Sequence, residues 1–388
     1  MRHTEPIWFV LVWRLTIILF TALVASFHYE NPPPDNLIDL LDRTLVQWDA
    51  GFYLAIAQDG YADNPSKAAF YPLLPILIRA THAAVPSWRA AGALVVHAAL
   101  IGALFYLHAL ARLDHGREVA RRAVVFALFF PTAIFLGAIY TESLLLLTMT
   151  ASVYHARRGQ WWMAGLWGAA AGLTKMVGGV VVVPLLWEYW RSEAWRSACE
   201  GWKPDWRKLA RTLPALALVP LGALAFLVGL HLSFGSYRIY FAMQESWRRH
   251  SFFRPFIPDG WMFLTSWLKG EGDTVINYYY PQAGLSRPST HAFMAIDLLF
   301  LTVFLIMGIV LCVRVRGSYG LLVFAVLGMA AFSGSPQSLN RFAVILFPSF
   351  IGFALAARHL VVGFGLFALS GALLAFFSFL FVNGFWAG

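Results

Sequence analysis

The sequence predicts an all-α protein that crosses a membrane several times, and three observations predict this class. The 388 residues are 59% hydrophobic and 13% charged, whereas soluble domains average about 25% charged residues. Apolar runs of about 20 residues, the length of a membrane-spanning helix, recur along the chain. Lysine and arginine gather in short clusters between those runs, as they do in cytoplasmic loops. The net charge of +9 therefore indicates membrane topology rather than nucleic-acid binding.

We expect about eleven spans within a single membrane domain. Several expected spans are shorter than the roughly 20 residues of an ideal span. They cover residues 7–27, 90–111, 118–139, 141–157, 160–174, 177–190, 212–233, 291–313, 317–333, 340–357 and 360–384. We divide the domain into a core catalytic part, 1–211, and a C-terminal part, 212–388, and no internal repeat is visible.

The charge bias orients these spans with the N-terminus in the cytoplasm. The segments then inside hold sixteen Lys and Arg residues, and the longer outside segments hold only eleven. Two long loops, 28–89 and 234–290, fall outside. Within the first loop, residues 68–85 are apolar but short and contain two prolines, so we expect a helix in the membrane interface. If this segment spanned instead, the basic clusters downstream would fall outside, against the charge rule.

The stretch VQWDAGFYLAIAQDGY (46–61) places one aspartate, Asp49, in the first outer loop. The side chain fits the N-cap of a short helix that Gly60 ends. It also fits a chemical role, because the positive end of a helix keeps a carboxylate ionised, and an ionised carboxylate can accept a proton from a hydroxyl. The sequence leaves both roles open.

Other charged residues fall at the outer ends of expected spans, and each has an ordinary structural explanation. Glu142 could complement a helix dipole, and Lys175 and Arg341 could anchor span ends at the interface. The same residues suit chemistry, because carboxylates at the face of a membrane bundle are often functional and Lys and Arg bind phosphate. Arg249 belongs to a basic segment of the second outer loop. Cations on an outer face oppose the charge rule, which favours an anionic ligand there.

Two carboxylates, several cations and many aromatic rings on one face suit group transfer from a lipid phosphate to a hydroxyl. The leaving phosphate needs cations, and the acceptor hydroxyl needs a base. Tryptophan and tyrosine rings stack on sugars and sit well at interfaces. A nucleotide-linked donor would need a cytoplasmic nucleotide site, and the inside loops show no motif for one.

The chain resembles the PIG-V family, the second mannosyltransferase of GPI-anchor synthesis, and its bacterial relatives. The resemblance begins with QWDAGFYLAIAQDGY and AAFYPLLPIL in the first outer loop. It continues in order through FPTAIFLGAIYTESL, RRGQWWMAGLWGAAAGLTKMVG, YFAMQESWRR and SLNRFAVILFPSF. Two positions depart from the pattern, because Phe342 stands where the family has tyrosine and Lys175 where it has arginine.

The resemblance implies a GT-C-type glycosyltransferase, a multi-span helical bundle with a catalytic acid in its first outer loop. It implies a polyprenyl- or dolichyl-phosphate sugar donor, typically of mannose, a lipid-linked or glycan acceptor, and inversion at the anomeric carbon. Asp49 would be the catalytic base, and Glu142 would be the second catalytic carboxylate. The residues that would hold the donor phosphate and the substrate are Trp48, Lys175, Gln244, Trp247, Arg249 and Arg341.

We expect no obligatory cofactor or metal, because Arg and Lys alone can hold a monophosphate, although a divalent ion at Asp49 and Glu142 would be compatible with the pattern. The short chain, rich in Ala, Arg and Gly, indicates a bacterial plasma membrane rather than the endoplasmic reticulum, with the site on the extracytoplasmic face.

Two other classes of protein stay open for this sequence. One is a lipid or glycolipid transporter or flippase, and the other is a non-catalytic membrane assembly subunit. Transporters tend to carry repeats and buried charges near the midplane, whereas here the charges collect at the outer rim.

Overall fold

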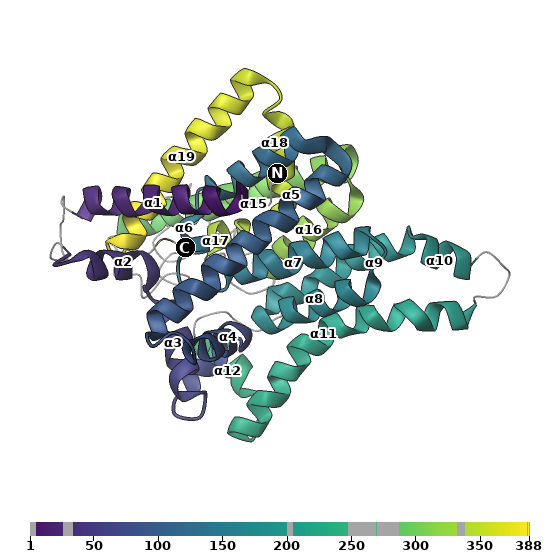
Figure 1. Cartoon of the computed structure of the whole chain (residues 1–388), viewed down its shortest axis with the longest axis horizontal. Coiled ribbons are helices and arrows are strands. Elements are labelled where there is room, and N and C mark those ends of the chain that lie inside the picture. Colours follow the sequence, from purple (N-terminus) through teal and green to yellow (C-terminus); the bar gives the residue numbers. More distant parts are fainter. Residues whose placement is uncertain are drawn as a thin grey trace.

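The computed structural model describes residues 5–25, 34–199, 205–246, 269, 287–331, 338–385 and 387. Every regular element within these ranges is a helix (Figure 1). Five helices in the described ranges are long and apolar enough to cross a membrane, and shorter apolar helices accompany them. The all-α, multi-span class predicted from the sequence is confirmed.

The long helices are α1 (Glu5–Ala25), α5 (Trp88–Leu128), α11 (Trp206–Phe234), α15 (Arg287–Arg314) and α19 (Leu360–Val382). The elements before α11 that are shorter are α2 (Leu37–Leu45), α3 (Asp49–Asp59), the 3₁₀ helix η1 (Pro65–Ala69), α4 (Leu73–His82), α6 (Ile134–Gly137), α7 (Glu142–Arg157), α8 (Trp161–Thr174), the 3₁₀ helix η2 (Met176–Val181), α9 (Val182–Trp190) and α10 (Glu193–Ala198). Those after it are α12 (Ile239–Ser246), α16 (Gly317–Ala331), α17 (Leu339–Ala343) and α18 (Phe347–Ala356).

Helix α5 contains 41 residues but consists of two helices that meet at a kink. Gly116 has φ 79° and ψ −179° there, far from helical values. Glycine reaches this conformation without a Cβ penalty, which explains why the chain can break at a single residue. The predicted break between spans 90–111 and 118–139 is confirmed.

Two expected spans are interrupted, and each contains a proline. The helix expected over 118–139 ends at Leu128, and Pro131, which has no N–H to donate, lies in the turn before α6. The helix expected over 340–357 is divided into α17 and α18, and Pro348 lies in the first turn of α18, where proline is tolerated. The prediction of continuous helices was wrong at both places.

The described part of the loop expected over residues 28–89 folds into helices that are too short to cross a membrane. Helix α4 has 10 residues, a length of about 15 Å against a hydrocarbon core of about 30 Å. Figure 1 shows α3, α4 and α12 gathered at one edge of the molecule, and α3 and α4 pack against α5. The length of α4 agrees with the expectation that residues 68–85 do not span, and a place for this helix in the membrane interface stays a prediction.

Helices α8 and α11 approach closely because small residues line their contact. A Cβ added at Gly165 would lie 2.0 Å from the carbonyl oxygen of Ala215, and one added at Gly222 would lie 2.1 Å from that of Ala169. Small residues allow backbones to approach in this way in membrane bundles. Since Lys175 directly follows α8, this contact helps to fix where that side chain starts.

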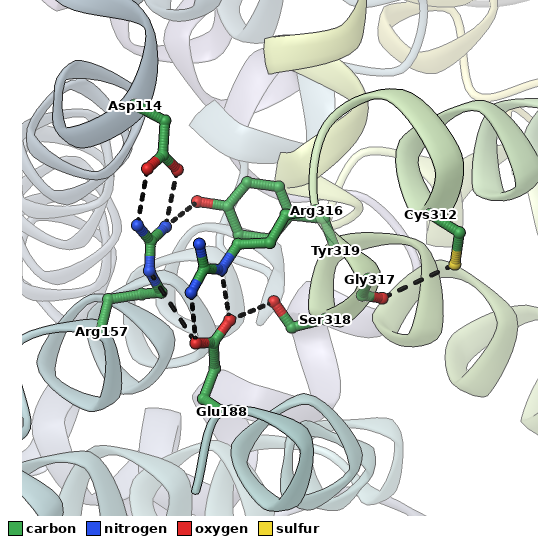
Figure 2. A network of polar contacts seen from close by, with 8 residues as sticks. All are labelled: Asp114, Arg157, Glu188, Cys312, Arg316, Gly317, Ser318 and Tyr319. Carbon is green, nitrogen blue, oxygen red and sulfur yellow. Dashed lines mark hydrogen bonds and ion pairs between the residues drawn. The ribbon is translucent and has the colours of Figure 1, made fainter. Parts of the chain in front are cut away.

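A partly buried polar network joins the ends of α7 and α9 to α5 and to the turn between α15 and α16 (Figure 2). Arg157 donates to both carboxylate oxygens of Asp114 at 2.7 Å. Arg316 donates to both oxygens of Glu188 at 2.6 and 2.7 Å, and the Ser318 hydroxyl donates to the same carboxylate. Bidentate arginine–carboxylate pairs of this kind are among the stronger ion pairs in proteins. The network lies at the end of the bundle that the charge bias assigns to the cytoplasm.

Candidate active site

Four charged residues singled out in the sequence meet in one cluster. Arg341 Nη1 donates to Asp49 Oδ2 at 2.9 Å, although the two residues are 292 positions apart. Arg341 Nε lies 3.0 Å from Glu142 Oε1. Lys175 Nζ donates to that same Glu142 oxygen at 3.1 Å. Two carboxylates and two cations therefore form one continuous, electrically balanced group, which we call the four-charge cluster.

Asp49 is the first residue of α3, and the interpretation of its side chain as the helix N-cap was wrong. Trp48 occupies the N-cap position, and no side-chain hydrogen bond caps the helix there. Gly60 ends the helix as predicted. The Asp49 carboxylate pairs with Arg341 and keeps 18% of its side chain exposed.

The backbone is strained at Trp48, the residue from which the chain enters α3. Trp48 has φ 36°, a region that costs a non-glycine residue about 1–3 kcal/mol and persists only where surrounding contacts hold it. The Trp48 ring packs edge-on against Phe381 of α19, with 5.5 Å between ring centroids. Strain of this kind is common at functional sites, and here it directly precedes Asp49.

Glu142 is the buried carboxylate of the four-charge cluster and contacts both of its cations. It is the first residue of α7 and only 2% exposed. The predicted complement to the helix dipole is confirmed in position, but Thr141 makes no side-chain cap. Because Glu142 contacts Lys175 and Arg341 and is closed to solvent, its geometry suits fixing cations better than meeting a substrate.

Aromatic rings surround the two cations. Lys175 Nζ lies 4.7 Å from the ring centroid of Phe342. The Arg341 guanidinium lies 5.2 Å from the Tyr140 ring and 5.6 Å from the Phe135 ring. Cations over aromatic faces gain about 0.5–2 kcal/mol, more where water is excluded. The rings therefore support charges that would otherwise be costly to bury.

Sequence reasoning missed two residues that hold the segment carrying Arg341. The Asp297 carboxylate on α15 accepts the backbone N–H of Asn340 at 3.0 Å. The Thr132 hydroxyl donates to the backbone carbonyl of Asn340 at 2.9 Å. Asp297 is 3% exposed, and the available signal was an acid inside the apolar run AFMAIDLLFL, since intramembrane acids are commonly functional.

Three further residues were predicted to belong to the site, and the structure describes one of them. Gln244 in α12 donates to the backbone carbonyl of Ala69 at 3.4 Å and so joins the second outer loop to the first. Trp247 and Arg249 lie outside the described residues. In the part of the chain that the structure describes, no group of three or more His, Cys, Asp or Glu side chains is arranged to hold a metal ion.

The helical membrane fold of this chain is similar to that of a solved enzyme. An oligosaccharyltransferase from Archaeoglobus fulgidus, tethered with an acceptor peptide, aligns with 97% of this chain and 56% of its own, at a TM-score of 0.50 and 14% sequence identity. At that identity the likeness concerns the fold alone. The GT-C-type architecture predicted from the sequence is confirmed.

Within that class the chain resembles the PIG-V mannosyltransferases, as predicted. A family described as Mannosyltransferase (PIG-V) matches residues 10–193, which include Asp49, Glu142 and Lys175 but not Arg341. GPI alpha-1,6-mannosyltransferase 2 of Mus musculus is 31% identical over 252 residues, which cover 58% of this chain and 49% of that protein. The Rattus norvegicus protein of the same name is 32% identical over 185 residues, 41% of this chain and 37% of that protein. The chain thus spans about half, or less, of the length of these relatives.

Proposed function

We propose that this chain is a membrane glycosyltransferase that moves a hexose, mannose first of all, from a polyprenyl or dolichyl phosphate to a hydroxyl group. The acceptor is a lipid-linked sugar or a glycan. The observation that carries the proposal is the four-charge cluster, which brings two carboxylates and two cations together from four separate segments. The similarity to GPI alpha-1,6-mannosyltransferase 2 and the PIG-V family supports the sugar and the reaction class.

The two cations suit the leaving group of this reaction. The bond between the anomeric carbon and the phosphate oxygen breaks, and negative charge develops on the departing lipid phosphate. The Arg341 guanidinium is a planar fork that matches phosphate oxygens, and Lys175 adds a compact second charge. Preorganised cations of this kind stabilise charge that grows in the transition state.

Asp49 is the better placed of the two carboxylates to act as the base. Its side chain is 18% exposed, whereas that of Glu142 is 2% exposed. An arriving phosphate would compete with Asp49 for Arg341, so donor binding would free the carboxylate to accept the acceptor's proton. The acceptor oxygen then attacks the anomeric carbon opposite the phosphate, which inverts the configuration. Glu142 keeps the two cations in place throughout.

We place this reaction on the extracytoplasmic face of a bacterial plasma membrane, without an obligatory metal. The excess of basic residues in the opposite loops supports the side, since positive residues favour the cytoplasm. The inside loops carry no nucleotide motif, which favours a lipid-linked donor. Lys and Arg supply the charge that a divalent ion supplies in other transferases.

The direct test is sugar transfer by the purified full chain reconstituted in sealed lipid vesicles. Synthetic polyprenyl-phosphate mannose serves as donor, polyprenyl-phosphate glucose as the sugar control, and a nucleotide-linked mannose as the donor-class control. We expect mannose to reach a lipid-linked acceptor from the first donor alone. If the protein moves labelled donor lipid between leaflets without transferring sugar, it is a flippase, and if it does neither, the enzyme proposal is wrong.

A further inference from the structure

The segment that carries Arg341 is too short to hold its own shape. Helix α17 has 5 residues, far fewer than the roughly 12–15 that a helix needs for marginal stability in isolation. Ser338 precedes it in the left-handed region, with φ 72°, and supplies no side-chain cap. The position of Arg341 therefore depends on contacts from outside α17.

The backbone N–H of Asn340 illustrates this dependence. It lies in the first turn of α17, where an N–H has no partner within the helix. In most helices the preceding side chain satisfies such a group, but Ser338 does not. The Asp297 carboxylate, which belongs to another helix, α15, accepts this N–H instead, at 3.0 Å from the Asn340 nitrogen.

The carbonyl group of Asn340 is also held by a side chain from elsewhere. The N–H of Val344, its partner in a regular α-helix, bonds to Arg341 O instead. The hydroxyl of Thr132, in the turn after α5, donates to the Asn340 oxygen at 2.9 Å. Asp297, Thr132 and Asn340 are all at most 3% exposed, so water does not offer an easy substitute.

We propose that Asp297 and Thr132 are positioning residues for Arg341. By holding the N–H and the C=O of the preceding residue, they set the direction from which the guanidinium reaches Asp49 and Glu142, and so the place at which it meets the donor phosphate. The inference rests on the proposed function. A displacement of about 1 Å in such a group can lower the rate about 10²-fold.

The test compares variants that keep or remove each hydrogen bond. Asp297→Asn and Thr132→Ser keep an acceptor and a hydroxyl, whereas Asp297→Leu and Thr132→Val remove them. Thr302→Val is the matched control, because the Thr302 hydroxyl lies on the same helix α15 and donates only to Leu298 O of that helix. The measurements are kcat and KM with polyprenyl-phosphate mannose, the Kd of polyprenyl phosphate, and the thermal midpoint.

We expect Asp297→Leu and Thr132→Val to weaken polyprenyl phosphate binding at least 10-fold and to lower kcat/KM about 10²-fold. For Asp297→Asn, Thr132→Ser and the control Thr302→Val, kcat/KM and the Kd of polyprenyl phosphate should stay within about threefold of the parent values. In an Arg341→Lys background, Asp297→Leu should cause little further loss, because coupled residues give non-additive effects.

Two outcomes would overturn the inference. One is an equal loss from Asp297→Leu with and without Arg341, which would show independent action. The other is a lower thermal midpoint with unchanged polyprenyl phosphate affinity, which would show a purely structural role. If the parent protein binds polyprenyl phosphate but transfers no sugar, the proposed function fails, and the binding data still decide the inference about Asp297 and Thr132.

Discussion

Glu142→Gln removes the charge shared by two cations while keeping the size of the side chain. Glu142 is 2% exposed and lies 3.1 Å from Lys175 Nζ and 3.0 Å from Arg341 Nε. At an effective dielectric constant of about 20, one such pair at 3 Å is worth roughly 5 kcal/mol before desolvation. Removing one partner of a buried pair costs about 3–5 kcal/mol. Because Arg341 stays paired with Asp49, we expect a loss at the lower end of this range, a fall of about 3 kcal/mol in the free energy of unfolding.

A second variant separates charge balance from lost contacts. Glu142→Gln combined with Lys175→Met leaves Asp49 and Arg341 as one neutral pair. The double variant should therefore be more stable than Glu142→Gln alone, although it lacks one more side-chain contact. Chemical unfolding in detergent micelles, followed by the fluorescence of the chain's 16 tryptophans, measures the free energy of unfolding of the single and the double variant. A loss below about 1 kcal/mol for Glu142→Gln, or fully additive losses, would refute the account of a shared counter-ion.

The other predictions concern the bundle and the metal. Gly165→Ala should lower the thermal midpoint by several degrees, because the new Cβ would lie 2.0 Å from Ala215 O. Gly179→Ala should leave the midpoint unchanged, because its Cβ would meet nothing within 4 Å. Scanning fluorimetry compares the two variants. Glu188→Gln breaks the fork with Arg316 and should lower the midpoint while leaving KM for the donor unchanged in a steady-state assay. Chelation of divalent ions with EDTA should leave the transfer rate unchanged, and restoration of a lost rate by Mg²⁺ or Mn²⁺ would contradict the metal-free mechanism.

The sequence predicted the class and much of the cluster because those signals are local. Long apolar runs and basic turns reveal the class. Asp49 was visible as a charge in the first expected outer loop, and Glu142, Lys175 and Arg341 were visible as charges at the expected outer ends of spans. The two broken helices were predicted as continuous, because average hydropathy hides a single proline, although Pro131 and Pro348 carry the physical reason for the breaks.

The pairings within the cluster could not be read from the sequence. A capping role and a chemical role for Asp49 have the same local pattern. The structure excludes the cap, because Trp48 holds the N-cap position and Asp49 pairs with Arg341, 292 residues away. Asp297 was passed over for the same reason, since its partner Asn340 lies on a different helix. The division at residue 211 stays a prediction, and the cluster joins residues from both of its sides.

The central claim is that Asp49 is the base of a transfer site whose phosphate is held by Arg341 and Lys175. The most direct measurement is the single-turnover rate of mannose transfer from polyprenyl-phosphate mannose by Asp49→Asn, together with its Kd for polyprenyl phosphate. The account predicts a rate about 10²–10⁴-fold below the parent's, with a Kd equal to or tighter than the parent's, because Asn no longer competes for Arg341. Transfer by Asp49→Asn at close to the parent rate would contradict it.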